Sequence, residues 1–395
     1  MNLMHPWACD RGRPAAPAGS SRARHRRCWL TIVALAMAPA AFTAADEQLA
    51  PGVRYRVIGE PEDPQVFHVL EIDRGAAGIS FVSSVGAGVR GAETVEQMAR
   101  MLPAERGRVV PAINGDFFQM GGDQYRGTVQ GMTVIDGELA SGPGGGHAFC
   151  VDREGRPSIE PLGDRFEIAW PDGRKTPLRV NGATSDAQSE VGAADVVLFT
   201  PRFDASTRTK AGRELVLTPA PDGPPLPLRV GQTSTATVSE IAPGTDTPIK
   251  PGTMVLSLAT NAVAAAPAAR PGDTLRISTA PDGAWADCVT AISGDPVLLA
   301  GGQIKPAPDA EKLARAIRTA VGYGPKQIVL VAATRWGASH REMAERLHAM
   351  GCTDAVNLDG GGSSTMLVNG KSVVPAPGRG QRPVGNALLV VQKVP

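Results

Sequence analysis

Residues 355–364 read Ala-Val-Asn-Leu-Asp-Gly-Gly-Gly-Ser-Ser, an apolar strand that ends in Asn-x-Asp and runs into three glycines. A second apolar strand, residues 109–113, ends in the same way at Asn114-Gly115-Asp116. Polar groups at strand ends sit on a rigid support where the chain leaves the sheet, so they are well placed to face a ligand. Glycines allow close backbone approach, and successive N–H groups can form an anion-binding nest. The pattern predicts a phosphate site, with a plain turn as the alternative because Gly, Asn and Asp dominate turns.

Two arginine segments strengthen the phosphate interpretation. Arg318-Thr319 and Arg382-Pro383-Val384-Gly385-Asn386 each precede an apolar strand. A guanidinium group can bind phosphate through two parallel hydrogen bonds, and the hydroxyls of Ser363 and Ser364 would add donors. No Gly-Lys-Ser/Thr follows the glycines, so the segment is not a P-loop.

Working outward, short apolar runs bounded by Gly and Pro predict strands at 53–57, 66–72, 79–82, 109–113, 327–333 and 355–359. Capping boxes at Thr94 and Ser339 predict helices that end near Pro103 and Gly351. Residues 313–320 also suggest a helix, although 317–323 fit a strand equally well. Strands and helices mixed without a regular βαβ repeat predict an α+β fold, a mixed or antiparallel sheet packed with a few helices.

The middle of the chain, residues 150–285, is dense in Pro and Gly and has no long helical period. We interpret it as a β-rich insertion or subdomain within one domain over residues 46–395. Its one polar cluster, residues 181–186, is explained by a turn.

The N-terminal 45 residues have the pattern of a secretory signal. They carry six arginines and one acid, which gives +5 and leaves −4 for the remainder of a chain whose net charge is +1. An uncharged stretch from Cys28 to Ala45 follows the arginines, so we predict cleavage after Ala45 and an exported, periplasmic or secreted, protein with no membrane span after cleavage. An uncleaved membrane anchor is the alternative. A remainder at −4 without a basic stripe argues against nucleic-acid binding.

Three cysteines remain after the predicted cleavage site: Cys150, Cys288 and Cys352. They can supply one disulfide and one thiol, or three buried small hydrophobic side chains. No Cys-x-x-Cys or His-Glu-x-x-His spacing is present, so a zinc hydrolase is not expected.

With these motifs the chain resembles the phosphodiester glycosidase family over residues 50–392. The most specific anchors are residues 357–364, Asn-Leu-Asp-Gly-Gly-Gly-Ser-Ser, and Arg-Pro-Val-x-Asn at 382–386. The further anchors are 112–118, 131–139 and 318–322. The chain departs from the family at Ala333-Thr334-Arg335, where relatives usually have Asp-Gly-Arg, and at Asp116, where many have Gly.

The resemblance implies a hydrolase that cleaves the glycosidic C1–O bond of sugar-1-phosphodiesters in envelope or extracellular glycans. Asp359 is the expected nucleophile or base and Asp116 the second carboxylate. The expected substrate- or phosphate-binding residues are Asn114, Arg318, Thr319, Asn357, Gly360, Gly361, Gly362, Ser363, Ser364, Arg382 and Asn386.

Two other functions fit the same residues. The polar strand ends could hold a divalent cation, although none is expected as a resident cofactor, and would then form a metal-dependent phosphodiesterase. The missing carboxylate at Ala333 instead favours a non-catalytic polysaccharide-binding envelope protein. Trp170, Trp285 and Trp336, the tryptophans beyond the predicted leader, are few for such a role, because carbohydrate-binding surfaces usually stack sugars on aromatic rings.

Overall fold

The computed structural model describes residues 46–60, 62–122, 124–187, 193–220, 226–279, 285–305, 314–375 and 380–393. These residues lie within a single compact unit, 42–395. The leader predicted at residues 1–45 lies outside them. No helix in the described ranges has both the length and the apolar character needed to cross a bilayer.

One eight-stranded sheet combines strands from residues 46–73 with strands from residues 297–357. Apart from two parallel pairs elsewhere, β12 with β15 and β13 with β14, every named strand pair in the described part of the fold is antiparallel. The order of the sheet is β1 (Asp46–Ala50), β2 (Val53–Ile58), β3 (Gln65–Asp73), β24 (Gln327–Ala338), β23 (Ala316–Tyr323), β25 (Asp354–Asn357), β21 (Val297–Ala300) and β22 (Gln303–Ile304).

Two five-stranded sheets complete this part of the fold. One has the order β27 (Lys371–Ser372), β26 (Met366–Val368), β5 (Arg108–Asn114), β28 (Ala387–Gln392) and β4 (Ile79–Ser84). The other has the order β7 (Glu138–Ser141), β6 (Thr133–Ile135), β20 (Cys288–Gly294), β8 (Gly144–Asp152) and β9 (Pro157–Gly163).

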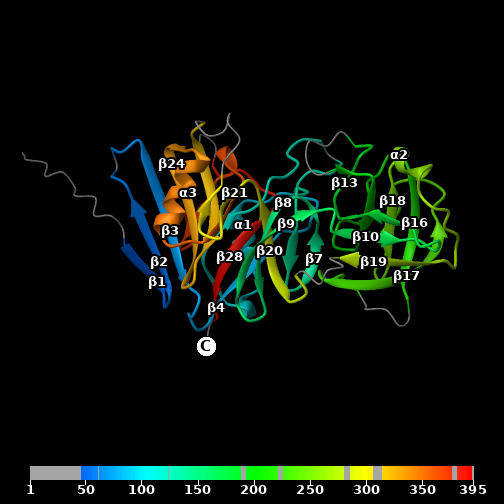
Figure 1. Ribbon diagram of the computed structural model, residues 1–395, viewed down its shortest axis with the longest axis horizontal. Coiled ribbons are helices and arrows are strands. Elements are labelled where there is room, and N and C mark those ends of the chain that lie inside the picture. The colour runs from blue at the N-terminus through cyan, green and yellow to red at the C-terminus, as the bar shows by residue number, and fades with distance from the viewer. Residues whose placement is uncertain are drawn as a thin grey trace, which may run out of the picture. The chain divides into compact units, whose positions relative to one another are not determined.

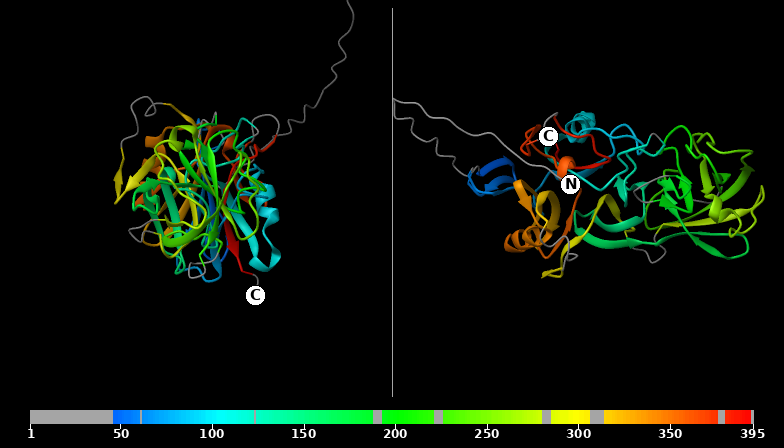
Figure 2. Two further views of the ribbon diagram at one scale, coloured as in Figure 1. Left: turned by 90° about the vertical axis from the view of Figure 1, so that its right-hand side faces the viewer. Right: turned by 90° about the horizontal axis from the view of Figure 1, so that it is seen from above.

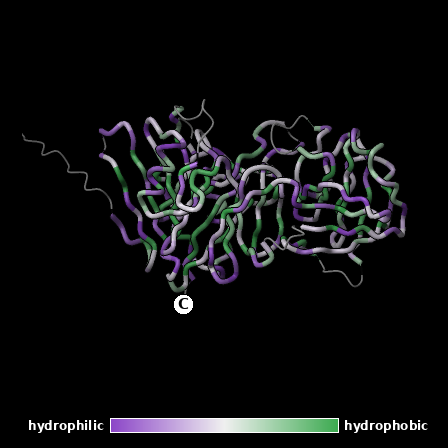
Figure 3. The backbone as a smooth tube through the Cα atoms, in the orientation of Figure 1, coloured by the Kyte–Doolittle hydropathy of each residue, from purple (hydrophilic) through white to green (hydrophobic). Residues whose placement is uncertain are grey.

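The middle of the chain forms a second eight-stranded sheet, drawn in green and yellow-green in Figure 1 and grouped apart from the terminal strands in Figure 2. Its order is β11 (Lys175–Pro177), β10 (Phe166–Ala169), β19 (Thr274–Thr279), β17 (Gln232–Ile241), β16 (Arg213–Pro219), β18 (Met254–Leu258), β15 (Val196–Phe199) and β12 (Arg179–Val180). A short pair, β13 (Ala183–Thr184) and β14 (Ala193–Ala194), lies beside it in sequence. Hydrophobic segments run through both groups of strands in Figure 3, as expected for sheets that pack on one another.

The fold is mostly β, so the predicted α+β class is wrong. Strands make up 49% of the structure and helical residues 8%. Both capping boxes do begin helices, α1 (Val95–Met101) and α3 (His340–Ala349), and α2 (Thr260–Val263) is a single turn. The segment that also suggested a helix at 313–320 is strand in its described part, β23. It is covered on both faces, which removes the polar alternation by which an isolated strand is recognised.

The two faces of the first eight-stranded sheet have different neighbours. Helix α3 covers one face, where its Met343 and Leu347 are fully buried with Ala333 of β24. The other face packs against the two five-stranded sheets through a core that includes Ile113 and Leu388. The ends of β5, β25 and β28 meet at this second interface, and the Asn-x-Asp segments lie there.

The three cysteines are buried and carry free thiols: Cys150, Cys288 and Cys352. Burial raises the pKa of the Cys352 thiol to about 12. In this structure they therefore act as small core side chains.

Candidate functional site

The two Asn-x-Asp segments, which belong to different sheets, are bonded to each other. The Asn114 amide at the end of β5 donates to the backbone carbonyl of Asp359 at 2.8 Å. In return the Asp359 N–H donates to the carbonyl of Gly115 at 2.9 Å, and the N–H of Thr365 donates to Asn114 Oδ1 at 2.9 Å. The chain on both sides of the glycine segment is thus fixed to the end of β5.

Asp116 is held in a closed set of backbone donors. The N–H of Phe117 donates to its Oδ1 at 2.8 Å, and the N–H of Gly131 donates to its Oδ2 at 2.7 Å. Its own N–H donates to Asn386 Oδ1 at 2.8 Å. Only 3% of the residue is exposed, so both carboxylate oxygens are oriented by the protein.

Burial of the Asp116 side chain raises its pKa to about 7. The N–H groups of Gly131 and Phe117 and the charge of Arg179 oppose this rise, whereas the charge of Asp359 adds to it. This brings the pKa of the carboxyl group toward neutral pH, which suits a group that both accepts and donates a proton.

Asp359 is partly exposed and can meet a ligand. The N–H of Gly360 donates to its Oδ1 at 2.8 Å. Burial raises the pKa of Asp359, and the nearby Ser363 hydroxyl, the Gly360 N–H and the charge of Arg382 counteract part of that rise.

Arg382 packs directly on the glycine segment. A Cβ atom at Gly362 would lie 2.3 Å from Arg382 Nη2, so no other residue type fits there without moving the guanidinium. Gly360 packs in a similar way against the carbonyl of Ile317, at 3.0 Å from a Cβ position. Arg382 also donates to Met120 Sδ at 3.5 Å. The glycines therefore bring a cation, a carboxylate and exposed backbone into one place.

Three predicted ligand-binding residues instead support the carboxylates. Asn114, Asn386 and Thr319 are each 0% exposed. The Asn386 amide donates to Thr133 Oγ1 at 2.8 Å, and the Thr319 hydroxyl donates to the Asp359 carbonyl at 2.9 Å. Their polar atoms hold the backbone around Asp116 and Asp359.

Arg318 and Asn357 are hydrogen-bonded to other segments of the chain. Arg318 donates from Nε to Ala338 O at 2.8 Å, and its Nη1 lies 2.7 Å from His340 Nε2 at the start of α3. The Asn357 amide donates to Asp295 O at 2.9 Å. Side chains alternate between the faces of a strand, so Arg318 lies opposite Thr319, whose hydroxyl reaches Asp359. Of the two predicted arginines, the structure brings Arg382 to Asp359.

Ser363 and Ser364 follow the three glycines at the end of the glycine segment. Ser364 Oγ donates to Ile317 O at 3.3 Å, and Ser363 is 1% exposed within the 3₁₀ turn Gly361–Ser363.

The departure at Ala333 has a packing reason in this chain. Ala333 is 0% exposed on the face of β24 that α3 covers, in a cluster with Phe67 and Met343. A carboxylate there would be buried among apolar side chains, which costs several kcal/mol without a partner. The following Arg335 takes a left-handed φ of 62° and leads to Trp336, which is 72% exposed.

Sequence reasoning missed Arg179, Gly131 and Thr133. Arg179 lies in the middle sheet, far along the chain from every motif, and is 3% exposed. Its Nη1 donates to Gln130 O at 2.8 Å and its Nη2 to Val129 O at 2.5 Å. The nearby dipeptide Asn181-Gly182 was a weak signal for a site at Arg179, because it fits a plain turn equally well.

Within the described ranges, no three His, Cys, Asp or Glu side chains gather into a group that could hold a metal ion.

Residues 230–391 match the model of the phosphodiester glycosidase family. This match confirms the resemblance indicated by the motifs at 357–364 and 382–386. The motifs at 112–118 and 131–139 lie outside the matched range. Among curated proteins, none matches the chain.

Solved structures share the fold. A hypothetical protein from Synechocystis has a TM-score of 0.69 at 20% identity, with 89% of this chain and 64% of that chain covered. The "Putative exported protein" from Burkholderia pseudomallei K96243 has a TM-score of 0.58 at 22% identity, with coverage of 86% and 74%. The zebrafish N-acetylglucosamine-1-phosphodiester alpha-N-acetylglucosaminidase catalytic domain, auto-inhibited by its pro-peptide, has a TM-score of 0.43 at 16% identity, with coverage of 89% and 87%. The chain thus spans just under two thirds of the Synechocystis protein.

Proposed function

We propose that the chain hydrolyses the glycosidic C1–O bond of sugar-1-phosphodiesters, because residues 230–391 match the model of the phosphodiester glycosidase family. The observation that carries the proposal is the contact of Arg382 with Gly362 beside the carboxylate of Asp359. An exposed cation next to a partly exposed carboxylate suits a substrate whose phosphate and anomeric carbon are neighbours.

The chemistry of the leaving group explains why we expect the Arg382 cation to contribute strongly to the rate. Cleavage of the C1–O bond releases a phosphomonoester, whose second pKa is about 6, so it leaves more readily than the alcohol of an ordinary glycoside. Strong general-acid assistance is therefore less necessary than in glycosidases that rely on a carboxylic acid to protonate the leaving oxygen. The Arg382 guanidinium would stabilise the charge that develops on the phosphate.

Asp359 would act at the anomeric carbon. Its carboxylate is partly exposed and oriented by the Gly360 N–H, so it can serve as nucleophile or as the base that activates water. Asp116 would act as the second carboxylate, supporting Asp359 through its charge and exchanging a proton near neutral pH. Asn114, Asn386 and Thr319 would position these two groups.

We place the substrate in envelope or extracellular glycans. The support is the leader pattern of residues 1–45, and the name of the Burkholderia pseudomallei relative points to export as well.

The decisive assay uses a panel of sugar-1-phosphodiesters in H₂¹⁸O, with and without EDTA. We expect free sugar and a phosphomonoester that contains no ¹⁸O, because C1–O cleavage adds water to the sugar. Incorporation of ¹⁸O into the phosphate would instead indicate P–O cleavage, and EDTA-sensitive P–O cleavage a metal-dependent phosphodiesterase. Binding of the glycan without turnover would indicate a polysaccharide-binding protein.

One variant pair tests the assignment of Asp359. Asp359→Asn should abolish sugar release while the circular dichroism spectrum stays unchanged. The matched control is Asp172→Asn, since Asp172 is exposed in a turn of the middle sheet. Undiminished turnover by Asp359→Asn would refute the assignment.

A further inference from the structure

Arg179 joins the middle sheet to the carboxylate site. It belongs to β12, at the edge of that sheet, yet its two terminal nitrogens donate to the carbonyls of Val129 and Gln130. The same stretch continues to Gly131, whose N–H donates to Asp116 Oδ2 at 2.7 Å. The N–H of Gln130 also donates to Phe117 O at 2.8 Å, so residues 129–131 lie between Arg179 and Asp116.

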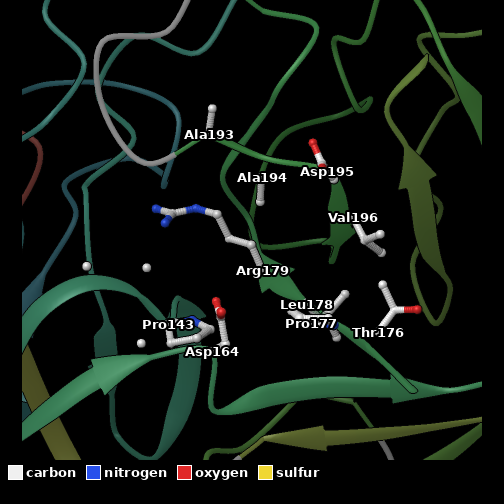
Figure 4. Close-up of a pocket in the computed structure, with 13 residues that line it drawn as sticks. Pro143, Asp164, Thr176, Pro177, Leu178, Arg179, Ala193, Ala194, Asp195 and Val196 are labelled. Carbon is white, nitrogen blue, oxygen red and sulfur yellow. The ribbon is translucent and has the colours of Figure 1, made fainter. Parts of the chain in front are cut away.

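Two glycines make room for the Arg179 side chain. A Cβ atom at Gly182 would lie 1.8 Å from Arg179 Nε, and one at Gly144 would lie 2.2 Å from Nη1. Figure 4 shows the side chain extended across a cavity whose lining includes Pro143, Asp164 and Asp195. The cavity has a volume of about 570 Å³. The Arg179 guanidinium therefore lies in close contact with Gly144 and Gly182 and bonds to two backbone carbonyls.

Burying this arginine has an energetic cost that the contacts only partly offset. Its Nε is buried and has no hydrogen-bond partner among the residues that the structure describes, and burial lowers the pKa of the guanidinium to about 10. A buried cation is expensive unless it is paired, and a well-packed apolar side chain would often be as stable or more stable. Retention of arginine at this position is better explained by what its charge and its two donors do than by stability.

Arg179 and Asp359 are charged groups that act on Asp116. The positive charge of Arg179 lowers the pKa of Asp116, and the negative charge of Asp359 raises it. The backbone amides of Phe117 and Gly131 also face the Asp116 carboxylate.

We propose that Arg179 is a positioning residue for the hydrolytic reaction, which fixes the 129–131 backbone so that the Gly131 N–H stays on the Asp116 carboxylate. The proposal rests on the function proposed above. On this proposal the middle sheet contributes to the site, because its strand β12 supplies the Arg179 guanidinium.

Three variants distinguish the positioning role of the Arg179 side chain from the effect of its positive charge. Arg179→Met removes the charge and both donors, while Arg179→Lys keeps a charge that cannot reach both carbonyls with a planar fork. Gly182→Ala keeps the arginine but displaces its Nε, and Gly182 does not have a left-handed φ that alanine would strain. The matched control is Arg276→Met on β19, where the side chain is exposed on the same sheet.

The first readout is kinetic, on the substrate that wild type hydrolyses. We expect kcat to fall roughly tenfold to a hundredfold in Arg179→Met and Gly182→Ala with little change in KM, because a misplaced group acts on the reacting state. Arg179→Lys should lie between these variants and wild type, and Arg276→Met should equal wild type. The pH dependence of kcat should shift in Arg179→Met toward higher pH.

The second readout needs no activity. Titration of ¹³C-labelled aspartate by NMR, with the Asp116 signal assigned from Asp116→Asn, should give a value near 7 in wild type and a higher value in Arg179→Met. An unchanged titration in both Arg179→Met and Gly182→Ala, with activity lost only in proportion to thermal stability, would overturn the proposal. If wild type hydrolyses no sugar-1-phosphodiester, the proposed function fails, whereas the titration still reports whether Arg179 controls Asp116. If Arg179→Met does not fold, the Lys and Gly182→Ala variants decide the question.

Discussion

The side-chain amide of Asn114 donates to the backbone carbonyl of Asp359 at 2.8 Å, although 245 residues separate them in the chain. Asn114 ends a strand of a five-stranded sheet, and Asp359 follows a strand of the first eight-stranded sheet. The bond therefore joins two sheets at the point where each supplies a carboxylate. Because Asn114 is fully buried, its loss would loosen both strand ends together.

Replacing Arg382 with lysine should impair the reaction despite the conserved charge. Lysine offers a point charge, whereas the guanidinium can bind two phosphate oxygens at once. We expect kcat/KM on a sugar-1-phosphodiester to fall by roughly 10–100-fold. Steady-state kinetics would measure this, with Arg100→Lys on the exposed face of α1 as the control. Unchanged kinetics would show that Arg382 does not contact the phosphate.

Gly362→Ala should reduce activity by moving Arg382. The added Cβ would lie 2.3 Å from Nη2, so the guanidinium must shift away from Asp359. Activity should fall as far as in Arg382→Lys, while the melting temperature changes little. Gly121→Ala is the matched control, because a Cβ there meets nothing within 4 Å. Full activity in Gly362→Ala would mean that the position of Arg382 is not critical.

Asn386→Ala should destabilise the protein. Asn386 is 0% exposed, and its amide bridges the Asp116 N–H and the Thr133 hydroxyl. Loss of these buried bonds should lower the free energy of unfolding by about 2–4 kcal/mol. Urea unfolding would measure the change, and Asn261→Ala on the exposed face of α2 should alter stability by less than about 0.5 kcal/mol. A similar small effect for Asn386→Ala would contradict its supporting role.

The stability of the wild-type protein should fall relative to Asp116→Asn as the pH rises from 4 to 8. The pKa of Asp116 is raised to about 7 in the folded protein from a usual value of 3.8. Between these values the folded state holds a proton that the unfolded chain has released, so this contribution is complete below pH 4 and lost by pH 7. The difference in unfolding free energy should change by up to about 4 kcal/mol.

Urea unfolding at several pH values would measure that difference. Asp172→Asn should show no comparable change between pH 4 and 8, since the backbone N–H and side chain of Arg174 lower the pKa of Asp172 and its contribution to stability changes only below about pH 4. A pH-independent difference between wild type and Asp116→Asn would show that Asp116 is ionised throughout.

Local signals predicted the features that depend on near neighbours in the chain. The capping boxes at Thr94 and Ser339 begin helices as expected, because both partners of each box lie within four residues. The Asn-Gly pair at residues 369–370, a dipeptide that favours a two-residue hairpin turn, connects β26 and β27. The family resemblance followed from motifs of this local kind.

The α+β expectation was wrong for a physical reason. Buried strands such as β23 lack polar alternation because they are covered on both sides, and their apolar runs fit a helix as well as a strand. Strand pairing is set by partners far away in the chain, such as β3 with β24, so local patterns cannot count the sheets.

Local sequence patterns were enough to identify the two Asn-x-Asp strand ends, the glycine segment, Arg382 and the resemblance to the family whose model residues 230–391 match. Which arginines lie close enough to act on the two carboxylates is set by the tertiary structure. It turned Arg318 toward His340 and brought Arg179 from the middle sheet to the backbone behind Asp116. The reason is that a strand's neighbours and the direction of its side chains are fixed by long-range pairing and burial, which no short stretch of sequence contains.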